Sequence, residues 1–303
     1  MAAHLVGKEA GLFVTSGTMG NLTALLAHCG RGDEVILGDS SHTFNYEAGG
    51  MAALGGVQPH PVQNQSDGTL ALQDMQAGIR ADDAHHPRTR LICLENTHNL
   101  CGGAPLSPEY TAQVGALASA HGLRLHIDGA RIFNSAVAQN VVVTDLTGPA
   151  DSVTFCLSKG LCAPVGSVLC GSEDFIHRAH RVRKMLGGGM RQAGVLAAAG
   201  IVALEGMIER LADDHEHARQ LAAGLSQIRY IRLDRGSPQT NMVFINLTPD
   251  CPLDAPTVAG ELAERSIRVQ VKGPRRFRAV THYWITTSMI EDTVEAFRDI
   301  LRK

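Results

Sequence analysis

Short apolar runs with the residue preferences of β-strands alternate with helical segments from Leu12 to Cys170. Strands separated by helices are typical of an α/β fold, in which helices cover a mostly parallel sheet. In such a sheet, ligands bind at the edge where the carboxyl ends of the strands lie. The polar residues that directly follow each run are therefore the candidates for a functional site.

The run from Val153 to Ser158 alternates apolar and polar side chains with the period of a strand and leads directly into Lys159. Burial at a strand end disfavours the ammonium form of a lysine, and a neutral amine is a nucleophile that forms a Schiff base with a carbonyl. A lone lysine in this position more commonly extends to solvent. The rest of the chain decides between these two interpretations.

A turn of small residues, Ser16, Gly17 and Thr18, lies between a strand-like run and a helix expected from Leu22 to His28. The free N–H groups and the positive dipole end of such a helix bind anions. The sequence has neither the dinucleotide motif GxGxxG nor the phosphate-loop motif GxxxxGK[ST] at this place. The turn therefore fits the phosphate of a small cofactor better than a nucleotide, although an ordinary capped helix start has the same composition.

Three more polar positions follow strand-like runs: His42, the segment Asn96 to Asn99, and Asp128. Each has a plain alternative when taken singly, because loop histidines are common and Asp128 would form an ion pair with Arg131, three residues further on. Together with the lysine and the turn, these placements favour an active site at one edge of the sheet.

Composition excludes several classes of partner. A net charge of −3 and a pI near 6.5 give no basic surface for nucleic acid or for a membrane. The longest apolar stretch, Ala193 to Leu204, is too short to span a bilayer. His126 and Asp128 share a strand face, but no third ligand stands at a diagnostic spacing, so no metal site is expected. Seven cysteines without CxxC spacing predict free thiols in a reducing compartment, the cytoplasm, with the mitochondrion as the alternative if the natural start lies upstream.

The sequence predicts two domains, a large one over residues 1–212 and a small C-terminal α+β domain over residues 213–303. The second contains expected strands at Met242 to Leu247 and Arg278 to Ile285. A further expectation in the first domain is a helix from Tyr46 to Leu54. Arg278, an arginine at the start of a strand, would by itself be interpreted as surface charge.

Six segments jointly resemble the threonine aldolases: SGTMGN, HTFNYEAGG, LICLENTHN, HIDGARIFNSA, LSKGLCAPVGS and LGGGMRQAG. The resemblance extends over nearly all of the chain. It implies the aspartate-aminotransferase fold, which is also called the PLP-dependent transferase-like fold type I. It also implies pyridoxal phosphate (PLP) as cofactor and the retro-aldol cleavage of L-threonine or L-allo-threonine to glycine and acetaldehyde.

The same resemblance implies roles for the strand-end residues. Lys159 would carry the cofactor as a Schiff base, and Asp128 would pair with the protonated pyridine nitrogen. His42 would stack on the pyridine ring, and Ser16, Gly17 and Thr18 would hold the phosphate.

Substrate contacts and the catalytic base are also implied by the resemblance. Arg131 would lie beside the cofactor and the substrate, and Arg278 would bind the substrate carboxylate as a two-pronged fork. His85 matches the position that contacts the substrate hydroxyl, with His42 close enough to contribute, so that no single base is assigned. A surface loop histidine is the plain alternative for His85.

Lys184 and Arg191 match positions that reach a neighbouring subunit, which implies a homodimer or homotetramer. The resembling family has a further N-terminal segment before the position of Met1, so the chain is expected to be an N-terminally truncated member with weakened assembly and activity. Two other functions remain open: a related PLP-dependent β-eliminating lyase, and a non-catalytic subunit that associates with a full-length partner.

Overall fold

The computed structural model describes residues 1–234, 236 and 238–302. The chain forms two compact units, Met1–Glu209 and Arg210–Lys303. The boundary of the functional domains, placed at residue 212 from the sequence, remains a prediction. Among the described helices, none has the length and apolar character that crossing a membrane requires.

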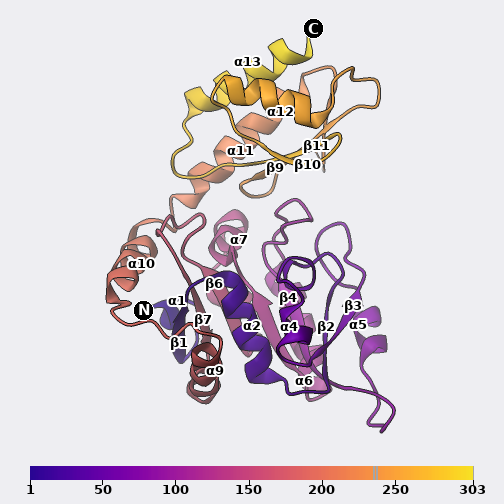
Figure 1. Ribbon diagram of the computed structural model, residues 1–303, viewed down its shortest axis with the longest axis vertical. Coiled ribbons are helices and arrows are strands. Elements are labelled where there is room, and N and C mark those ends of the chain that lie inside the picture. Colours follow the sequence, from indigo (N-terminus) through magenta and orange to yellow (C-terminus); the bar gives the residue numbers. More distant parts are fainter. Residues whose placement is uncertain (235, 237, 303) are drawn as a thin grey trace. The chain divides into compact units, whose positions relative to one another are not determined.

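The first unit is built on a seven-stranded sheet (Figure 1). Its strands, in spatial order, are β1 (Ala10–Val14), β7 (Ser167–Gly171), β6 (Ser152–Cys156), β5 (Arg124–Asp128), β4 (Arg88–Glu95), β2 (Asp33–Gly38) and β3 (Gln58–Val62). Strands β2 to β6 are parallel, and β7 runs antiparallel to both β1 and β6. The expected mostly parallel sheet is therefore confirmed.

Ten helices accompany the strands in the described part of this unit. They are α1 (Ala2–Leu5), α2 (Gly17–His28), α3 (His42–Asn45), α4 (Gly50–Ala53), α5 (Leu72–Gly78), α6 (Pro108–Ala120), α7 (Ile132–Gln139), α8 (Val143–Thr147), α9 (Glu173–Met185) and α10 (Gly194–Gly206). Helices α2 and α9 pack against each other and against strands β1 and β7, and α2 also contacts β5 and β6. Helix α6 packs on β5 and on α8.

The helix expected from Tyr46 to Leu54 is wrong. Helix α3 already begins at His42, and α4 begins only at Gly50. Between them Ala48 and Gly49 have φ angles of 54° and 64°, and this left-handed backbone cannot continue a right-handed helix. The break has a consequence for the site, because it lets Glu47 turn inward and become buried.

The second unit contains a four-stranded antiparallel sheet in the order β10 (Gln270–Gly273), β11 (Arg276–Val280), β9 (Met242–Leu247) and β8 (Ile231–Leu233). Its helices are α11 (Leu211–Ser226), α12 (Ala255–Glu264) and α13 (Thr287–Leu301). This confirms the expected small α+β architecture. The expected strand up to Ile285 is too long, because Thr281 leaves the ladder and its hydroxyl donates a hydrogen bond to the Asp214 carbonyl (2.5 Å).

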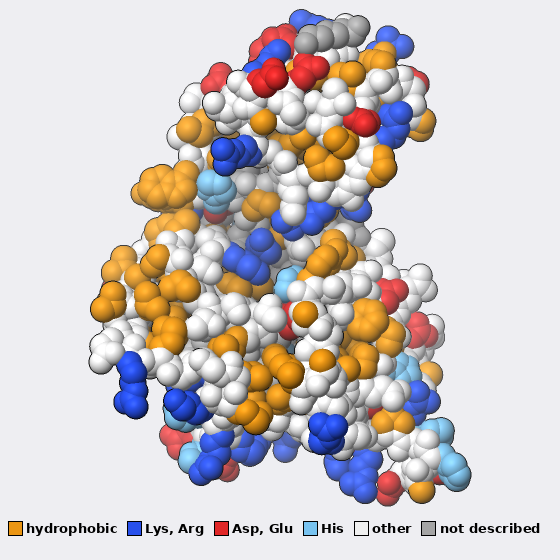
Figure 2. Space-filling model, in the orientation of Figure 1, with side chains coloured by type: hydrophobic (Ala, Val, Ile, Leu, Met, Phe, Trp, Pro, Cys, Tyr) orange, Lys and Arg blue, Asp and Glu red, His pale blue; other side chains and the backbone are white. Residues whose placement is uncertain are grey.

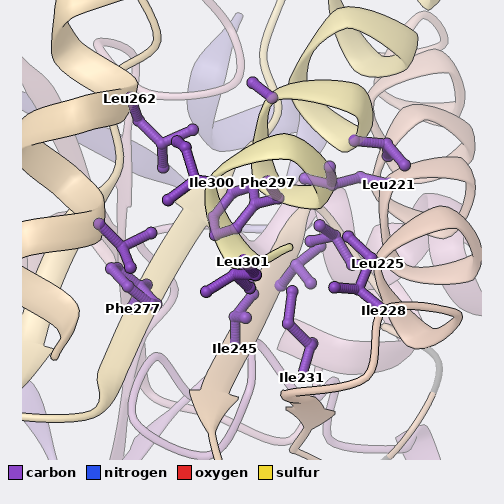
Figure 3. Close-up of a cluster of buried hydrophobic side chains, with 14 of the residues drawn as sticks. Leu221, Leu225, Ile228, Ile231, Ile245, Leu262, Phe277, Phe297, Ile300 and Leu301 are labelled. Atoms are coloured by element: carbon purple, nitrogen blue, oxygen red, sulfur yellow. The ribbon is translucent and has the colours of Figure 1, made fainter. Parts of the chain in front are cut away.

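Apolar side chains from all three helices and the sheet form the core of the second unit (Figure 3). Phe277 of β11 and Phe297 of α13 are fully buried, and their rings meet edge to face at 5.9 Å between centroids. Edge-to-face pairs add to the free energy gained by burying the rings. These two side chains therefore connect the last helix to the sheet.

Replacing Phe297 by alanine is expected to lower the free energy of unfolding by about 3–5 kcal/mol, because it removes a buried ring and leaves a cavity. Urea unfolding followed by circular dichroism measures this change. Val271→Ala, at a side chain that is 38% exposed in the same unit, is the control and should stay within about 0.5 kcal/mol of the unchanged chain. An equal effect of the two substitutions would contradict the assignment of this core.

Candidate active site

The carboxyl ends of β2, β4, β5 and β6 lie at one edge of the sheet, because these strands are parallel. Backbone hydrogen bonds join the segments that follow them: the Asn96 amide donates to the Asp128 carbonyl (2.8 Å), and the Gly129 amide donates to the Thr154 carbonyl (2.7 Å). The residues that follow these strands in the sequence therefore lie along a single edge of the sheet.

The turn before α2 lies at this edge beside the end of β6. Ser16 is the N-cap of α2, and its hydroxyl accepts a hydrogen bond from the Met19 amide (3.1 Å). A Cβ atom at Gly17 would lie only 3.1 Å from the Cys156 sulfur, so the backbone here lies directly against the last residue of β6. The first N–H groups of a helix have no partner within the helix, and an anion can bind them.

Lys159 lies in the loop that follows β6, and it is half-buried. The loop is closed on itself: the Leu157 amide donates to the Gly166 carbonyl (3.0 Å), and the Cys162 amide donates to the Lys159 carbonyl (3.0 Å). A lysine on a fixed loop, three residues beyond Cys156, is thus close in the chain to the residue that contacts Gly17. The turn and the loop that carries the lysine, far apart in the sequence, therefore both lie at the end of β6.

Asp128 ends β5 and is 3% exposed. One carboxylate oxygen accepts a hydrogen bond from the Asn21 side-chain amide (2.9 Å), and the other accepts from the Ala130 backbone amide (3.2 Å). These donors hold an ionised carboxylate in a buried position. Arg131, three residues on, is half-buried at the start of α7 at the same edge.

Glu47 is a buried carboxylate of this site to which sequence reasoning assigned no role. Its Oε1 atom accepts hydrogen bonds from Nδ1 of His42 (3.0 Å) and from the Asn21 amide (2.9 Å). Side-chain atoms of His42, Glu47 and Asp128 lie within 4.8 Å of one another. The only sequence signal for Glu47 is its place in the HTFNYEAGG segment, because a helix from Tyr46 would not have predicted its burial.

The pKa of His42 is raised above its ordinary value, first by its hydrogen bond to Glu47, and burial opposes this shift. Burial raises the pKa of Glu47, and hydrogen bonds from His42 and Asn21 oppose that shift. The charge-assisted contribution of His42 to stability is therefore fully present below the ordinary histidine pKa. It is lost as the pH rises through the raised pKa.

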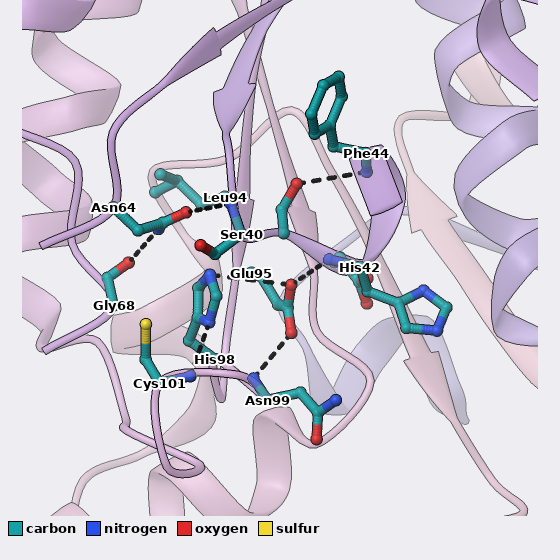
Figure 4. Close-up of polar contacts among 12 residues, drawn as sticks. Ser40, His42, Phe44, Asn64, Gly68, Leu94, Glu95, His98, Asn99 and Cys101 are labelled. Atoms are coloured by element: carbon teal, nitrogen blue, oxygen red, sulfur yellow. Dashed lines mark hydrogen bonds and ion pairs between the residues drawn. The ribbon is translucent and has the colours of Figure 1, made fainter. Parts of the chain in front are cut away.

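Glu95, the last residue of β4, is a second carboxylate that sequence reasoning missed (Figure 4). Its oxygens accept hydrogen bonds from the His42 backbone amide (2.6 Å) and from the Asn99 backbone amide (2.8 Å). The His98 ring lies 4.0 Å from it. Glu95 therefore fixes the start of α3, and with it the position from which the His42 side chain projects.

His85 does not join this group of residues. It lies in the loop before β4, and its side chain is 88% exposed and paired with Asp83 (2.7 Å). Strand β4 begins at Arg88 and reaches the site edge only at Glu95, so His85 is at the opposite edge, roughly 25 Å away at about 3.3 Å per residue. The order of the segments in the sequence already indicates this, because the polar loop precedes the strand and does not follow it. A role in the reaction would require the His85 of another subunit.

Three other residues expected to be functional lie elsewhere in the chain. Arg278 is half-buried in β11 of the second unit. Lys184, in the last turn of α9, and Arg191, in the loop before α10, are exposed. Their roles remain proposals.

Glu47→Gln is expected to lower the pKa of His42, because the change removes the carboxylate that is the largest cause of its raised value. A histidine-selective NMR titration of the unchanged chain and the variant measures the shift. Glu109→Gln, at an exposed position of α6, is the control and should leave the titration of His42 unaltered. Identical His42 titration curves for Glu47→Gln and the unchanged chain would contradict the pairing.

Comparison with known proteins identifies the family of this chain. The sequence model of the family described as "Beta-eliminating lyase" matches residues 1–248. The chain is 49% identical to low-specificity L-threonine aldolase 1 of Arabidopsis thaliana, over 99% of this chain and 84% of that protein. It is 42% identical to the low specificity L-threonine aldolase of Escherichia coli K12, over 100% of this chain and 87% of that protein.

Solved structures show the same fold. The threonine aldolase of Leishmania major matches with a TM-score of 0.82 at 21% identity, over 99% of this chain and 87% of that one. A serine palmitoyltransferase of Sphingomonas wittichii matches with a TM-score of 0.78 at 18% identity, over 99% of this chain and 74% of that one. The expected PLP-dependent transferase-like fold is thereby confirmed. The chain belongs to the β-eliminating lyase family and, within it, to the low-specificity L-threonine aldolases.

Proposed function

We propose that this chain binds PLP and cleaves the Cα–Cβ bond of L-threonine and L-allo-threonine, which releases glycine and acetaldehyde. One observation carries the proposal. A half-buried lysine, a buried aspartate, a histidine ring and a helix N-terminus lie at one sheet edge in a chain that is 49% identical to a plant low-specificity L-threonine aldolase.

The side chains of the site fit PLP by their chemistry. Lys159 offers an amine for a covalent link to the aldehyde, and the first turn of α2 offers N–H groups to the phosphate. Asp128 is buried and already held by two donors, so it can stabilise a positive charge on the ring nitrogen. When bound, PLP supplies a conjugated ring that takes up the electron pair released as the Cα–Cβ bond breaks.

His42 is the histidine that this site offers as a base for the β-hydroxyl proton. Its Nδ1 atom faces the Glu47 carboxylate, which can only accept when ionised, so the proton of neutral His42 lies on Nδ1 and Nε2 is free to accept. The neighbouring carboxylate makes the ring more basic and stabilises its charged form after proton transfer. His42 can therefore take up the hydroxyl proton at Nε2, directly or through a water molecule.

Arg131 and Arg278 are proposed to bind the substrate carboxylate. A guanidinium group binds a carboxylate through two parallel N–H···O bonds, which fixes the orientation of the amino acid as well as its position. For Arg131 the support is its place three residues after Asp128 at the site edge. For Arg278 the support is the resemblance to the family.

A homodimer or homotetramer is supported by an apolar surface on α10. Val195 and Val202 of this helix are 78% and 67% exposed, and Met185 at the end of α9 is 71% exposed. Figure 2 shows apolar side chains gathered over the helix that Figure 1 labels α10. An exposed apolar patch of this kind marks a contact with another protein. Lys184 directly precedes Met185 in the chain, and Arg191 lies in the loop just before α10, which supports their proposed reach into a neighbouring subunit.

Lys159→Ala is expected to abolish the covalent cofactor adduct and the release of glycine, because it removes the only nucleophile proposed for the link. The unchanged protein should be yellow, and borohydride reduction followed by peptide mass analysis should locate the adduct at Lys159. Lys272→Ala, in β10 of the second unit, is the control and should keep the adduct. An adduct on Lys184 or Lys272 would overturn the assignment, and ammonia plus a keto acid as products would indicate β-elimination instead.

Arg278→Ala is expected to raise KM for threonine by about tenfold to a hundredfold, because one bidentate contact to a carboxylate is worth about 1.5–3 kcal/mol. The affinity for PLP should not change. Steady-state kinetics and a cofactor titration measure the two quantities separately. Arg278→Lys keeps the charge but cannot form two parallel N–H···O bonds. Its KM for threonine should therefore lie between those of the unchanged chain and the alanine variant. An unchanged KM in the alanine variant would remove Arg278 from the substrate site.

A further inference from the structure

A continuous line of polar side chains, buried except for the half-buried His28 at its outer end, leads to Asp128, and the proposed reaction assigns no role to its histidines or its serine. It begins at His28, whose Nε2 atom lies 2.7 Å from the Ser152 hydroxyl. The same hydroxyl lies 2.8 Å from Nδ1 of His126, and Nε2 of His126 lies 3.3 Å from the Asn21 carbonyl oxygen. From Asn21 the side-chain amide nitrogen reaches both Asp128 and Glu47 at 2.9 Å.

The direction of every hydrogen bond in this line follows from its last members. Ionised carboxylates only accept, so the NH₂ group of Asn21 must face Asp128 and Glu47, and its oxygen must face His126. An amide oxygen also only accepts, so His126 carries its proton on Nε2 and accepts at Nδ1 from the Ser152 hydroxyl. The Ser152 oxygen in turn accepts from Nε2–H of His28.

Neutral histidines are required for this pattern, and their surroundings provide them. Burial lowers the pKa of His126 to about 3, with His28 as a further cause. Burial also lowers the pKa of His28 to about 3, with Arg124 and Arg178 as further causes. The His28 ring is stacked on Phe175 at 4.3 Å between centroids, which fixes the outer end of the line. Both rings are therefore uncharged at neutral pH, with one N–H each.

We propose that Asn21 is a positioning residue for the cofactor, and that His126, Ser152 and His28 fix the orientation of its amide. One NH₂ group then holds Asp128 for the ring nitrogen and holds Glu47, through which it positions His42 over the ring. This inference rests on the proposed binding of PLP. To that proposal it adds one residue, Asn21, which couples Asp128 with His42, the two groups proposed to contact the cofactor ring.

The need for such a residue follows from the charges. Two buried carboxylates whose atoms lie within 4.8 Å repel each other, and without donors one of them would take up a proton. Asparagine is also a poor choice inside a helix, because its side chain competes with the backbone for hydrogen bonds. Asn21 is 1% exposed inside α2, and both of its polar atoms are used.

Asn21→Leu tests the proposal, because leucine has nearly the same size and no donor. The full chain should bind PLP about tenfold or more weakly, since hydrogen bonds to two charged groups are lost. The pH at which the bound cofactor's visible absorbance changes should also shift. Thr23→Val is the matched control on the same helix. It is equally buried, and its hydroxyl has no hydrogen-bond partner among the described residues, so affinity and absorbance should not change.

A pair of substitutions at His126 separates positioning from stability. His126→Phe leaves the Asn21 oxygen without a donor and should weaken PLP binding, whereas His126→Gln restores an N–H group and should recover most of the affinity. A purely structural role predicts that both lower the melting temperature without a shift in the absorbance profile, and that result would overturn the proposal. Equal PLP affinity in Asn21→Leu and the unchanged chain would overturn it as well.

The cofactor-free chain gives an independent measurement. Nitrogen-15 NMR of the histidines should show His126 neutral at pH 7 with its proton on Nε2, and a proton on Nδ1 would overturn the proposed orientation of the amide. If the unchanged chain fails to bind PLP, the proposed function is wrong and the role toward the cofactor falls with it. The hydrogen-bond direction is then still decided by the NMR result, so the two failures are distinguishable.

Discussion

The close approach of α2 to the sheet is the contact on which the rest of this site depends. A Cβ atom at Gly20 would lie 2.5 Å from Cγ2 of Thr154, so only glycine lets the helix lie this near to β6. From this position the start of α2 presents its N–H groups beside the end of β6, and Asn21 reaches the end of β5. One helix therefore supplies both the anion-binding turn and the donor for the buried acids.

The buried carboxylates of the site show how negative charge is stabilised where solvent is excluded. Asp128, Glu47 and Glu95 are each at most 6% exposed, and each accepts at least two hydrogen bonds. A buried charge is tolerated when donors of this kind compensate for the lost water. Backbone amides and one asparagine provide most of these donors, so the three acids are held largely by neutral groups of the fold.

Histidines at this site differ in charge state because their surroundings differ. His42 lies beside a carboxylate and its pKa is raised, whereas His126 is fully buried with neutral hydrogen-bond partners and has a pKa lowered to about 3. The first takes up a proton more readily than an ordinary histidine, and the second can serve as a fixed donor. A single residue type thus fills two roles within one fold, and the environment of each ring decides between them.

The sequence by itself determined the parts of this protein that local pattern controls. Alternating strands and helices predicted a mostly parallel sheet, and the rule that ligands bind at the carboxyl ends of parallel strands brought Ser16, His42, Asp128 and Lys159 to one edge.

Only the tertiary structure decided what surrounds them. Glu47 and Asn21 belong to the site because a helix breaks at Ala48 and because α2 packs closely on β6, and neither event leaves a periodic signal in the sequence. The place of His85 outside the site could already be inferred from the sequence, because its loop precedes β4 and the strand's direction carries it to the far edge. Strand ends can be predicted from neighbours in the chain, whereas partners of a buried charge are set by contacts between segments far apart in sequence.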